Sequence, residues 1–165
     1  MVNVARRVFF GFHYDRDIQR VGQIRNSGVV LGPGDTSCGL VDSAEWDSIR
    51  RGGDGAILQW IDGQLRGTAV TVVLIGAETA NRQWINYEIV ESVRRGNGLL
   101  GVYIHNVRDS NGFTTAKGDN PFDYVTWRNT GARLSKEYAT YDWVRNDGHR
   151  NLSRWIEAAA KQAGR

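Results

Sequence analysis

An apolar run near the middle of the chain constrains the fold more than any other feature. Residues 69–76 read Ala-Val-Thr-Val-Val-Leu-Ile-Gly, so Thr71 is their only polar side chain. A strand with one face in water alternates apolar and polar residues, whereas a strand covered on both faces is apolar almost throughout. Parallel sheets with helices on both faces contain such strands. The run therefore predicts a central strand of a parallel sheet in an α/β protein.

Other patterns along the chain alternate between strand and helix periodicity. Residues 28–45 are too rich in glycine for a long element and are predicted as mainly loop, with a small strand at 29–31. Residues 106–135 are too long for a plain loop and are expected to hold local structure. The remaining expected elements are strands at 7–12, 99–105 and 140–144, and helices at about 15–26, 46–49, 57–65, 80–95 and 152–159.

Composition excludes several classes of protein. With 165 residues, 41% hydrophobic and 24% charged, the chain fits a single folded domain over residues 1–165 and has no run long enough to span a membrane. Cys38 is the only cysteine, which excludes an internal disulfide, and no Cys/His cluster has zinc-site spacing. We expect a cytoplasmic protein without a bound metal. The net charge of +3 is scattered, so a nucleic-acid partner is not expected.

Glu88 is the first candidate for chemistry, because it lies in a predicted helix that directly follows the central strand. Ligands of α/β proteins usually bind beyond the carboxyl ends of the strands, where such helices begin. At helical spacing Ile85, Ile89 and Val93 form one apolar row, and Trp84 and Glu88 form the row beside it. Glu88 is thus predicted at the rim of the buried face. Most isolated glutamates are solvated surface groups, and that alternative stays open from the pattern alone.

Glu91, in the same predicted helix, provides a comparison. It lies three and four residues before Arg94 and Arg95, the spacing at which helical side chains form ion pairs. We therefore predict ordinary surface electrostatics for Glu91 and little functional cost when it is replaced.

A second candidate group follows the first predicted strand. Phe12 and Tyr14 leave that strand on the crevice side and can stack on a base or pyridine ring, although core packing is the alternative. His13 can act as an acid, a base or a phosphate ligand, or simply as a hydrogen-bonding residue.

Two arginines of the following helix are candidates for phosphate binding. Arg20 is predicted either to pair with Asp17 or to contact a phosphate, and Arg25 is a second candidate phosphate contact.

The two glycine-rich stretches before the apolar run supply no familiar nucleotide-binding or hydrolase motif. The glycine-rich stretches 32–34 and 52–55 do not match G-x-G-x-x-G, and no G-x-x-x-x-G-K-[ST] loop or G-x-S-x-G elbow occurs. A redox nicotinamide cofactor and a P-loop nucleotide hydrolase are both disfavoured.

With these residues in view, the chain resembles TIR-like domains, and in particular those of the bacterial Thoeris antiphage system and their archaeal relatives. The Trp-x-x-x-Glu element formed by Trp84 and Glu88 is its most specific part. The similarity is carried by residues 8–14 with Asp17 and Arg20, and by residues 60–62, 73–76, 84–89, 100–105, 141–143 and 155–157. One position departs from the TIR pattern, because Gly11 stands where a serine is common.

The resemblance implies a flavodoxin-like, TIR-like three-layer fold with a central parallel sheet flanked by helices. It further implies a bacterial antiphage defence enzyme, an NAD+ glycohydrolase or ADP-ribosyl cyclase-like hydrolase acting on N-glycosyl bonds. Glu88 matches the catalytic glutamate, and substrate contacts are expected from Phe12, His13, Tyr14, Arg25 and Trp84. NAD is then a substrate, so no cofactor is expected.

The expected partners follow from the same resemblance. Cleavage at the nicotinamide-ribose bond would produce a cyclic ADP-ribose isomer that signals to a messenger-responsive effector protein. A phage-derived trigger and a homo-oligomer are further expectations, whereas a membrane partner is not expected.

Two alternatives to an enzyme remain at this point. The first is a non-catalytic TIR-like interaction module that acts by self-association. The second is a phosphoreceiver domain of the same fold, for which Asp15 and Asp17 are poor substitutes for the required strand-end aspartates.

Overall fold

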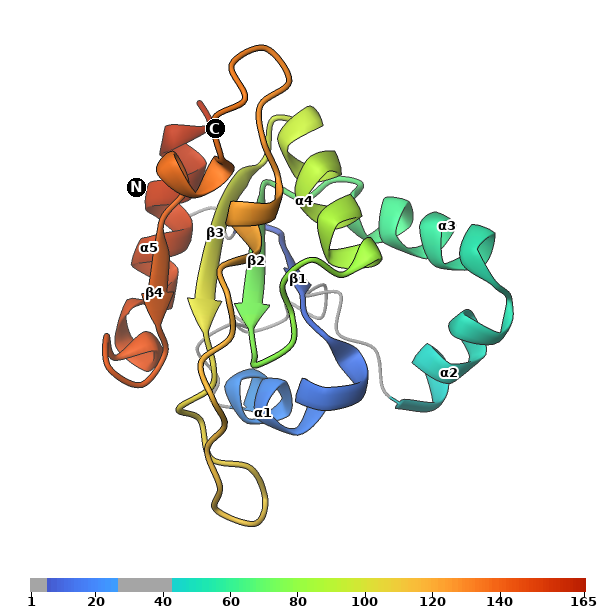
Figure 1. The fold of residues 1–165 in the computed structure, drawn as a ribbon, viewed down its shortest axis with the longest axis vertical. Helices are drawn as coiled ribbons and strands as arrows, with labels where there is room; N and C mark the ends of the chain where they lie inside the picture. The colour runs from blue at the N-terminus through green and yellow to red at the C-terminus, as the bar shows by residue number, and fades with distance from the viewer. Residues whose placement is uncertain (1–5, 27–42) are drawn as a thin grey trace.

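A four-stranded parallel sheet forms the middle layer of the computed structural model, which describes residues 6–26 and 43–165 (Figure 1). The strands lie in the order β1 (Val8–Gly11), β2 (Val70–Ile75), β3 (Gly98–Tyr103) and β4 (Thr140–Asp142). All neighbouring pairs are parallel, so the carboxyl ends of the strands meet at one edge of the sheet. The predicted α/β class is confirmed, and β2 lies inside the sheet as its apolar sequence predicts.

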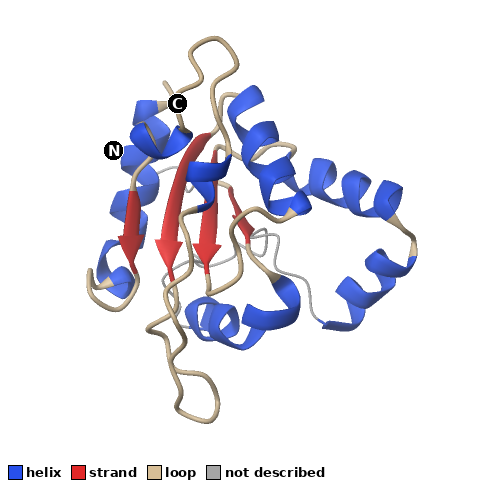
Figure 2. Ribbon diagram, in the orientation of Figure 1, coloured by secondary structure: helices blue, strands red, loops and turns tan. Residues whose placement is uncertain are grey.

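Helices cover both faces of the sheet and give the three layers expected of a flavodoxin-like fold (Figure 2). The helices are α1 (Tyr14–Asn26), α2 (Ser43–Arg51), α3 (Asp54–Leu65), α4 (Gln83–Arg94) and α5 (Gly148–Gln162), with short 3-10 turns η1 (Pro121–Tyr124) and η2 (Leu134–Lys136). Helices α1 and α5 pack on one face, and α4 packs with η1 and η2 on the other. None of the helices in the described part of the chain is long and apolar enough to cross a membrane.

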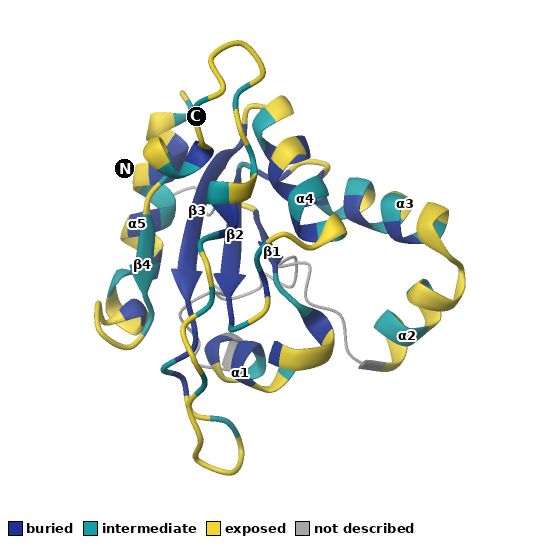
Figure 3. Ribbon diagram, in the orientation of Figure 1, coloured by how far each residue is buried: buried dark blue, intermediate teal, exposed yellow. Residues whose placement is uncertain are grey.

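Successive residues of β2 supply the cores of opposite faces. Val72 packs in the cluster that includes α1 and α5, whereas Val73 packs in the cluster that includes α4. Every residue of the four-residue β1 and of the six-residue β2 and β3 is buried, as Figure 3 shows. The one polar residue of the run, Thr71, is also buried, and its hydroxyl lies 2.7 Å from that of Ser92 in α4. A strand covered on both faces explains the uninterrupted apolar pattern.

A third apolar cluster attaches α2 and α3 to the sheet. Phe9 of β1 packs with Ile57 and Ile61 of α3, and Trp46 and Trp60 lie against the same cluster. This packing brings the first turn of α2 close to the carboxyl end of β1.

The sequence predicted most of these elements, with differences at their ends and in the connections. Helix α2 begins at Ser43, inside the segment predicted as loop; the rest of that segment, including the predicted strand at 29–31, lies outside the described residues. Helix α4 begins three residues later than expected, after a turn in which Asn81 has a positive φ of 59°. The unassigned connection contains η1 and η2, whose Phe122 and Leu134 are buried.

Candidate active site

A cavity of about 480 Å³ opens at the carboxyl edge of the sheet, where the sequence places the crevice. Its walls come from the residues after β1, the start of α1, one side of α2 and the first turns of α4. Five of the six predicted site residues line it, namely Phe12, His13, Tyr14, Trp84 and Glu88. The volume lies within the range of roughly 300–1,000 Å³ that is usual for small-molecule sites.

Glu88 is held in the wall of the cavity by the packing of α4 on β2. Its backbone carbonyl accepts a hydrogen bond of 2.6 Å from the hydroxyl of Ser92, which in turn contacts Thr71 of β2. In the preceding turn the backbone N–H of Gly76 donates to the hydroxyl of Thr79 at 2.8 Å. The first contact ties the second half of α4 to the start of β2, and the second holds the turn that leads from β2 to α4. Trp84 and Glu88 both line the cavity in this arrangement.

The carboxyl group of Glu88 is buried and has no hydrogen-bond partner in the described part of the chain. The residue is only 6% exposed, and its Oε2 atom has no hydrogen-bond partner among the described residues. Burial raises the pKa of Glu88 well above its usual value, because a charged carboxylate is poorly solvated in such a place. The alternative of a solvated surface carboxylate is therefore wrong.

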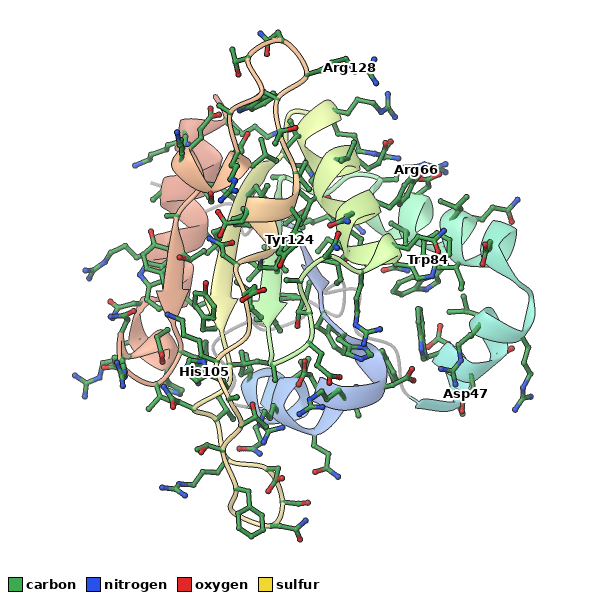
Figure 4. All side chains as sticks on the ribbon, viewed as in Figure 1. Asp47, Arg66, Trp84, His105, Tyr124 and Arg128 are labelled. Atoms are coloured by element: carbon green, nitrogen blue, oxygen red, sulfur yellow. The ribbon has the colours of Figure 1, made fainter. Side chains whose placement is uncertain are left out.

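Aromatic rings form one wall of the cavity. Tyr14 stacks on Phe12 with ring centroids 5.4 Å apart and on Trp46 with centroids 5.2 Å apart. Figure 4 shows Trp84 on the side of α4 that faces α3, where it packs edge-to-face against Tyr87. Tyr14 is 9% exposed, so its ring mainly supports the neighbouring rings rather than offering a free face for stacking.

Charged groups surround the entrance. Asp15 pairs with Arg50 of α2 at 2.9 Å, and Arg50 also reaches Asp47 at 2.9 Å. Arg82, the residue before α4, donates from Nε to the carbonyl of Glu78 at 2.7 Å. Arg82 also lies 3.9 Å from the carboxylate of Glu78, so both arginines are ion-paired, and an anionic ligand at the entrance would have to replace a carboxylate partner.

His13 carries no comparable charge. Burial, followed by the nearby Arg82, lowers its pKa below the usual value, so the ring is neutral at neutral pH. A neutral ring can donate or accept a hydrogen bond but does not attract phosphate as a cation.

The sequence did not identify Trp46, Arg50 or Arg82 as site residues. Arg82 could have been predicted from the sequence, because it immediately precedes the helix that contains Glu88. Trp46 and Arg50 belong to α2, and only the packing of α2 and α3 on Phe9 brings them to the cavity. Arg25 was predicted as a substrate contact, and its side chain lies outside the described residues.

Arg20 has a structural role that its sequence position did not reveal. Its Nε donates to the carbonyl of Val107 at 2.8 Å, and a terminal nitrogen donates to the carbonyl of Phe113 at 2.9 Å. It forms its ion pair with Asp109 at 3.7 Å rather than with Asp17, so the predicted pairing is wrong. Arg20 is 5% exposed and anchors the loop after β3, which leaves it closed to a phosphate.

Asp17 is a second buried carboxylate without a hydrogen-bond partner among the described residues. It is 1% exposed and lies against the backbone of Gly76, where an added Cβ would be 2.6 Å from its Oδ1 atom. Burial raises the pKa of Asp17 to about 6, against the opposing effects of Arg20, Arg16 and the nearby hydroxyl of Thr79. It does not line the cavity, and within residues 6–26 and 43–165 no group of three or more His, Cys, Asp or Glu is placed to hold a metal ion.

Glu91 forms the ion pairs that its spacing predicts. Its carboxylate accepts hydrogen bonds from Arg94, at 3.0 Å from Nε to Oε2, and from Arg95 at 3.3 Å. Hydrogen bonding to Arg94 lowers the pKa of Glu91 below its usual value. The residue is 8% exposed, so the pairing is confirmed but the predicted surface position is wrong.

Comparisons with known proteins agree with this architecture. The family model described as Thoeris protein ThsB, TIR-like domain, matches residues 9–109, a span that contains every residue lining the cavity. A protein of Bacillus cereus (strain MSX-D12) named "Putative cyclic ADP-D-ribose synthase ThsB1" is 33% identical over 192 residues, covering 93% of this chain and 100% of that protein. The chain therefore belongs to the family of ThsB TIR-like domain proteins of the Thoeris system.

Proposed function

We propose that this protein cleaves NAD at the nicotinamide-ribose bond and converts the remainder into a cyclic ADP-ribose isomer that signals during antiphage defence. Membership of the ThsB family and the name of the Bacillus cereus relative support this assignment. The observation that carries it is the buried, unpartnered carboxyl group of Glu88 in the wall of an aromatic cavity.

The bond to be broken explains why a carboxylate is useful there. When the bond between ribose C1′ and the nicotinamide nitrogen breaks, its electron pair leaves with nicotinamide, and the ribose becomes an oxocarbenium-like cation. A carboxylate close to the ribose stabilises this positive charge and can accept hydrogen bonds from the ribose hydroxyls. Glu88 supplies the carboxylate in this proposal.

Substrate binding would also ionise Glu88. In the free protein its raised pKa favours the neutral carboxylic acid. The nicotinamide ring of NAD is positively charged, and a cation beside a carboxyl group lowers its pKa. Binding therefore favours the anion in the complex, where the anion is needed.

The other cavity residues have matching roles. Arg50 and Arg82 provide positive charge for the diphosphate, whereas Phe12, Trp46 and Trp84 provide apolar surface for the rings. His13, as a neutral ring, can hydrogen-bond the substrate. NAD is consumed in this reaction and is not a recycled cofactor. The G-x-G-x-x-G match at residues 96–101 leads from a helix into β3, whereas a dinucleotide-binding fingerprint leads from a strand into a helix.

The product depends on what captures the ribose cation. Water gives ADP-ribose and releases a proton, while attack by a nucleophilic atom of the same molecule gives a cyclic isomer. Aromatic walls that keep the substrate folded and exclude water favour the second outcome. The cyclic product would then activate an effector protein, with a phage-derived trigger and self-assembly as further parts of the proposal.

Mass spectrometry of NAD products tests this function. Wild-type protein and Glu88→Gln would each be incubated with NAD, alone and with lysate from phage-infected cells. We expect nicotinamide and a cyclic ADP-ribose isomer from the wild type only. The absence of any Glu88-dependent product under both conditions would contradict the proposal, and defence that survives in Glu88→Gln would favour the interaction module instead.

A further inference from the structure

Gly11, the last residue of β1, lies directly beside the carboxyl group of Glu88. A Cβ atom built on Gly11 would lie 3.2 Å from Cδ of Glu88 and would overlap its Oε2 atom. The third-nearest atom belongs to the ring of Phe9, at an ordinary 3.8 Å. The carboxyl group of Glu88 thus occupies the space in which a side chain of residue 11 would begin.

The backbone does not explain a glycine at this position. Gly11 is paired in register with Val73 in the parallel sheet and is not among the residues with positive φ. Any residue can adopt such a strand conformation, so conformational freedom is not required. The absence of a side chain is the remaining physical reason for glycine.

We propose that Gly11 is a positioning residue, and that its missing side chain creates the space in which the carboxyl group of Glu88 lies in the cavity wall. A role of Gly11 in catalysis rests on the proposed function of Glu88. The placement of Gly11 beside the carboxyl group of Glu88 does not depend on that function. The departure from the serine of the common TIR pattern then has a cause, because a serine would collide with Glu88 where it now lies.

A side chain at position 11 should move Glu88 without unfolding the protein. The colliding atoms belong to the end of a flexible side chain, not to backbone. Behind Glu88 lies the packed interface of α4 and β2, so the open direction for the carboxyl group is the cavity. There it would gain water, a hydrogen-bond partner in the neutral ring of His13 and the nearby charges of Arg50 and Arg82, and it would occupy substrate space.

The first test is a titration of the Glu88 carboxyl group by carbon-13 NMR in wild type and Gly11→Ala, with the signal assigned by its loss in Glu88→Gln. We expect the midpoint to fall by about one pH unit or more in Gly11→Ala, because a better-solvated carboxyl group ionises more readily. Gly22→Ala is the matched control, since a Cβ at Gly22 meets nothing within 4 Å. Equal midpoints in wild type and Gly11→Ala would overturn the inference.

The second test is a double-mutant cycle on stability. At acid pH, where the Glu88 carboxyl group stays protonated, Gly11→Ala should be less favourable to the free energy of unfolding in the wild-type background than in the Glu88→Ala background, where the space is empty. Equal effects in the two backgrounds would also overturn the inference. Both measurements are independent of NAD cleavage. A wild type without NAD-cleaving activity would therefore reject the proposed function, whereas the positioning role of Gly11 is decided by the titration and the cycle alone.

Discussion

The two ends of the parallel strands define two edges of the sheet, and they differ in their buried polar side chains. These side chains are paired at the amino edge, where the strands begin, and several lack partners among the described residues at the carboxyl edge, where the strands end. At the amino edge, the end of α4 has its charges paired: Glu91 bonds with Arg94 and Arg95, and Arg95 also reaches Asp62 at 3.5 Å. Arg165 donates to the last carbonyls of this region, at 2.9 Å to that of Gly96. Within the described residues 90–98 and 157–165, no buried side-chain polar atom lacks a partner.

At the carboxyl edge, buried polar atoms without partners gather. Of the seven buried side-chain atoms without a hydrogen-bond partner among the described residues, five are both oxygens of Asp17, Oε2 of Glu88, Nε1 of Trp46 and Nδ1 of His105. The other two are Nε1 of Trp60 and Oδ1 of Asn86. His105 lies just beyond the end of β3, as labelled in Figure 4, with its Nε2 3.8 Å from Asp142. Folded proteins usually satisfy such groups, and the exceptions concentrate where a ligand or chemistry supplies the missing partner. We infer that the paired charges at the amino edge stabilise the fold and that the polar groups at the carboxyl edge serve ligand binding or catalysis.

The largest expected effect separates Glu88 from Glu91, two buried glutamates of one helix. Glu88→Gln should lower the rate of NAD cleavage by roughly 1,000-fold, because an amide cannot stabilise a developing cation as a carboxylate does. Glu91→Gln should stay within about threefold of the wild type, since Glu91 is remote from the cavity. The measurement is nicotinamide release under identical conditions. Similar losses of nicotinamide release in the two variants would contradict the assignment of different roles to the two edges of the sheet.

A large effect on stability is expected at Asp17. Its pKa of about 6, raised from the usual 3.8, means that the folded state favours the protonated form. The stabilisation is complete below about pH 4 and is lost as the pH rises through 6. Asp17→Asn, which mimics the neutral group, should therefore be more stable than the wild type above pH 7, by on the order of 3 kcal/mol.

Urea unfolding of Asp17→Asn and wild type at pH 4 and pH 8 measures this difference. We expect it to be near zero at pH 4. A variant that is less stable than the wild type at pH 8 would show that the charged carboxylate is satisfied after all.

A smaller effect of the opposite sign is expected at Glu91. Its pKa is lowered, so its ion pairs stabilise the fold above the usual glutamate pKa and lose that contribution as the pH falls through the lowered value. Glu91→Ala should reduce the free energy of unfolding at pH 7 by about 1–2 kcal/mol, because it leaves the partly buried Arg95 with fewer partners. An unchanged urea midpoint would count against a stabilising role for this edge.

The smallest expected effect is the pH dependence of cleavage. Burial raises the pKa of Glu88 and the anion is the active form, so kcat/KM should fall about tenfold per pH unit below that raised value. Its acid limb should therefore have a midpoint above the usual 4.5. A profile from pH 4 to 9 whose midpoint is at or below 4.5 would contradict the burial of the free carboxyl group.

The fold was largely predictable because its strongest signals are local. The uniform apolar run over residues 69–76 correctly predicts an inner strand, and the spacing of Ile85 and Ile89 correctly predicts the buried face of α4. The same spacing places Trp84 and Glu88 on one side, and both do face the cavity.

What could not be predicted depends on contacts between distant segments. Arg50 and Asp15 are 35 residues apart and meet only because α2 packs against the sheet through α3. Arg20 looks like a surface arginine until the loop after β3, 87 residues away, covers it. Glu91 has the spacing of a surface ion pair, and its burial arises from the packing of α4. The space that Gly11 provides for Glu88 is likewise invisible until β1 and α4 are placed side by side.

The most direct test of the account is a crystal structure of Glu88→Gln with NAD, since this variant should bind the substrate without consuming it. We expect NAD in the cavity at the carboxyl edge. The ribose next to nicotinamide should lie within hydrogen-bond distance of the residue 88 side chain, and the diphosphate should lie towards Arg50 and Arg82. NAD bound elsewhere on the molecule, or with that ribose remote from residue 88, would contradict this expectation.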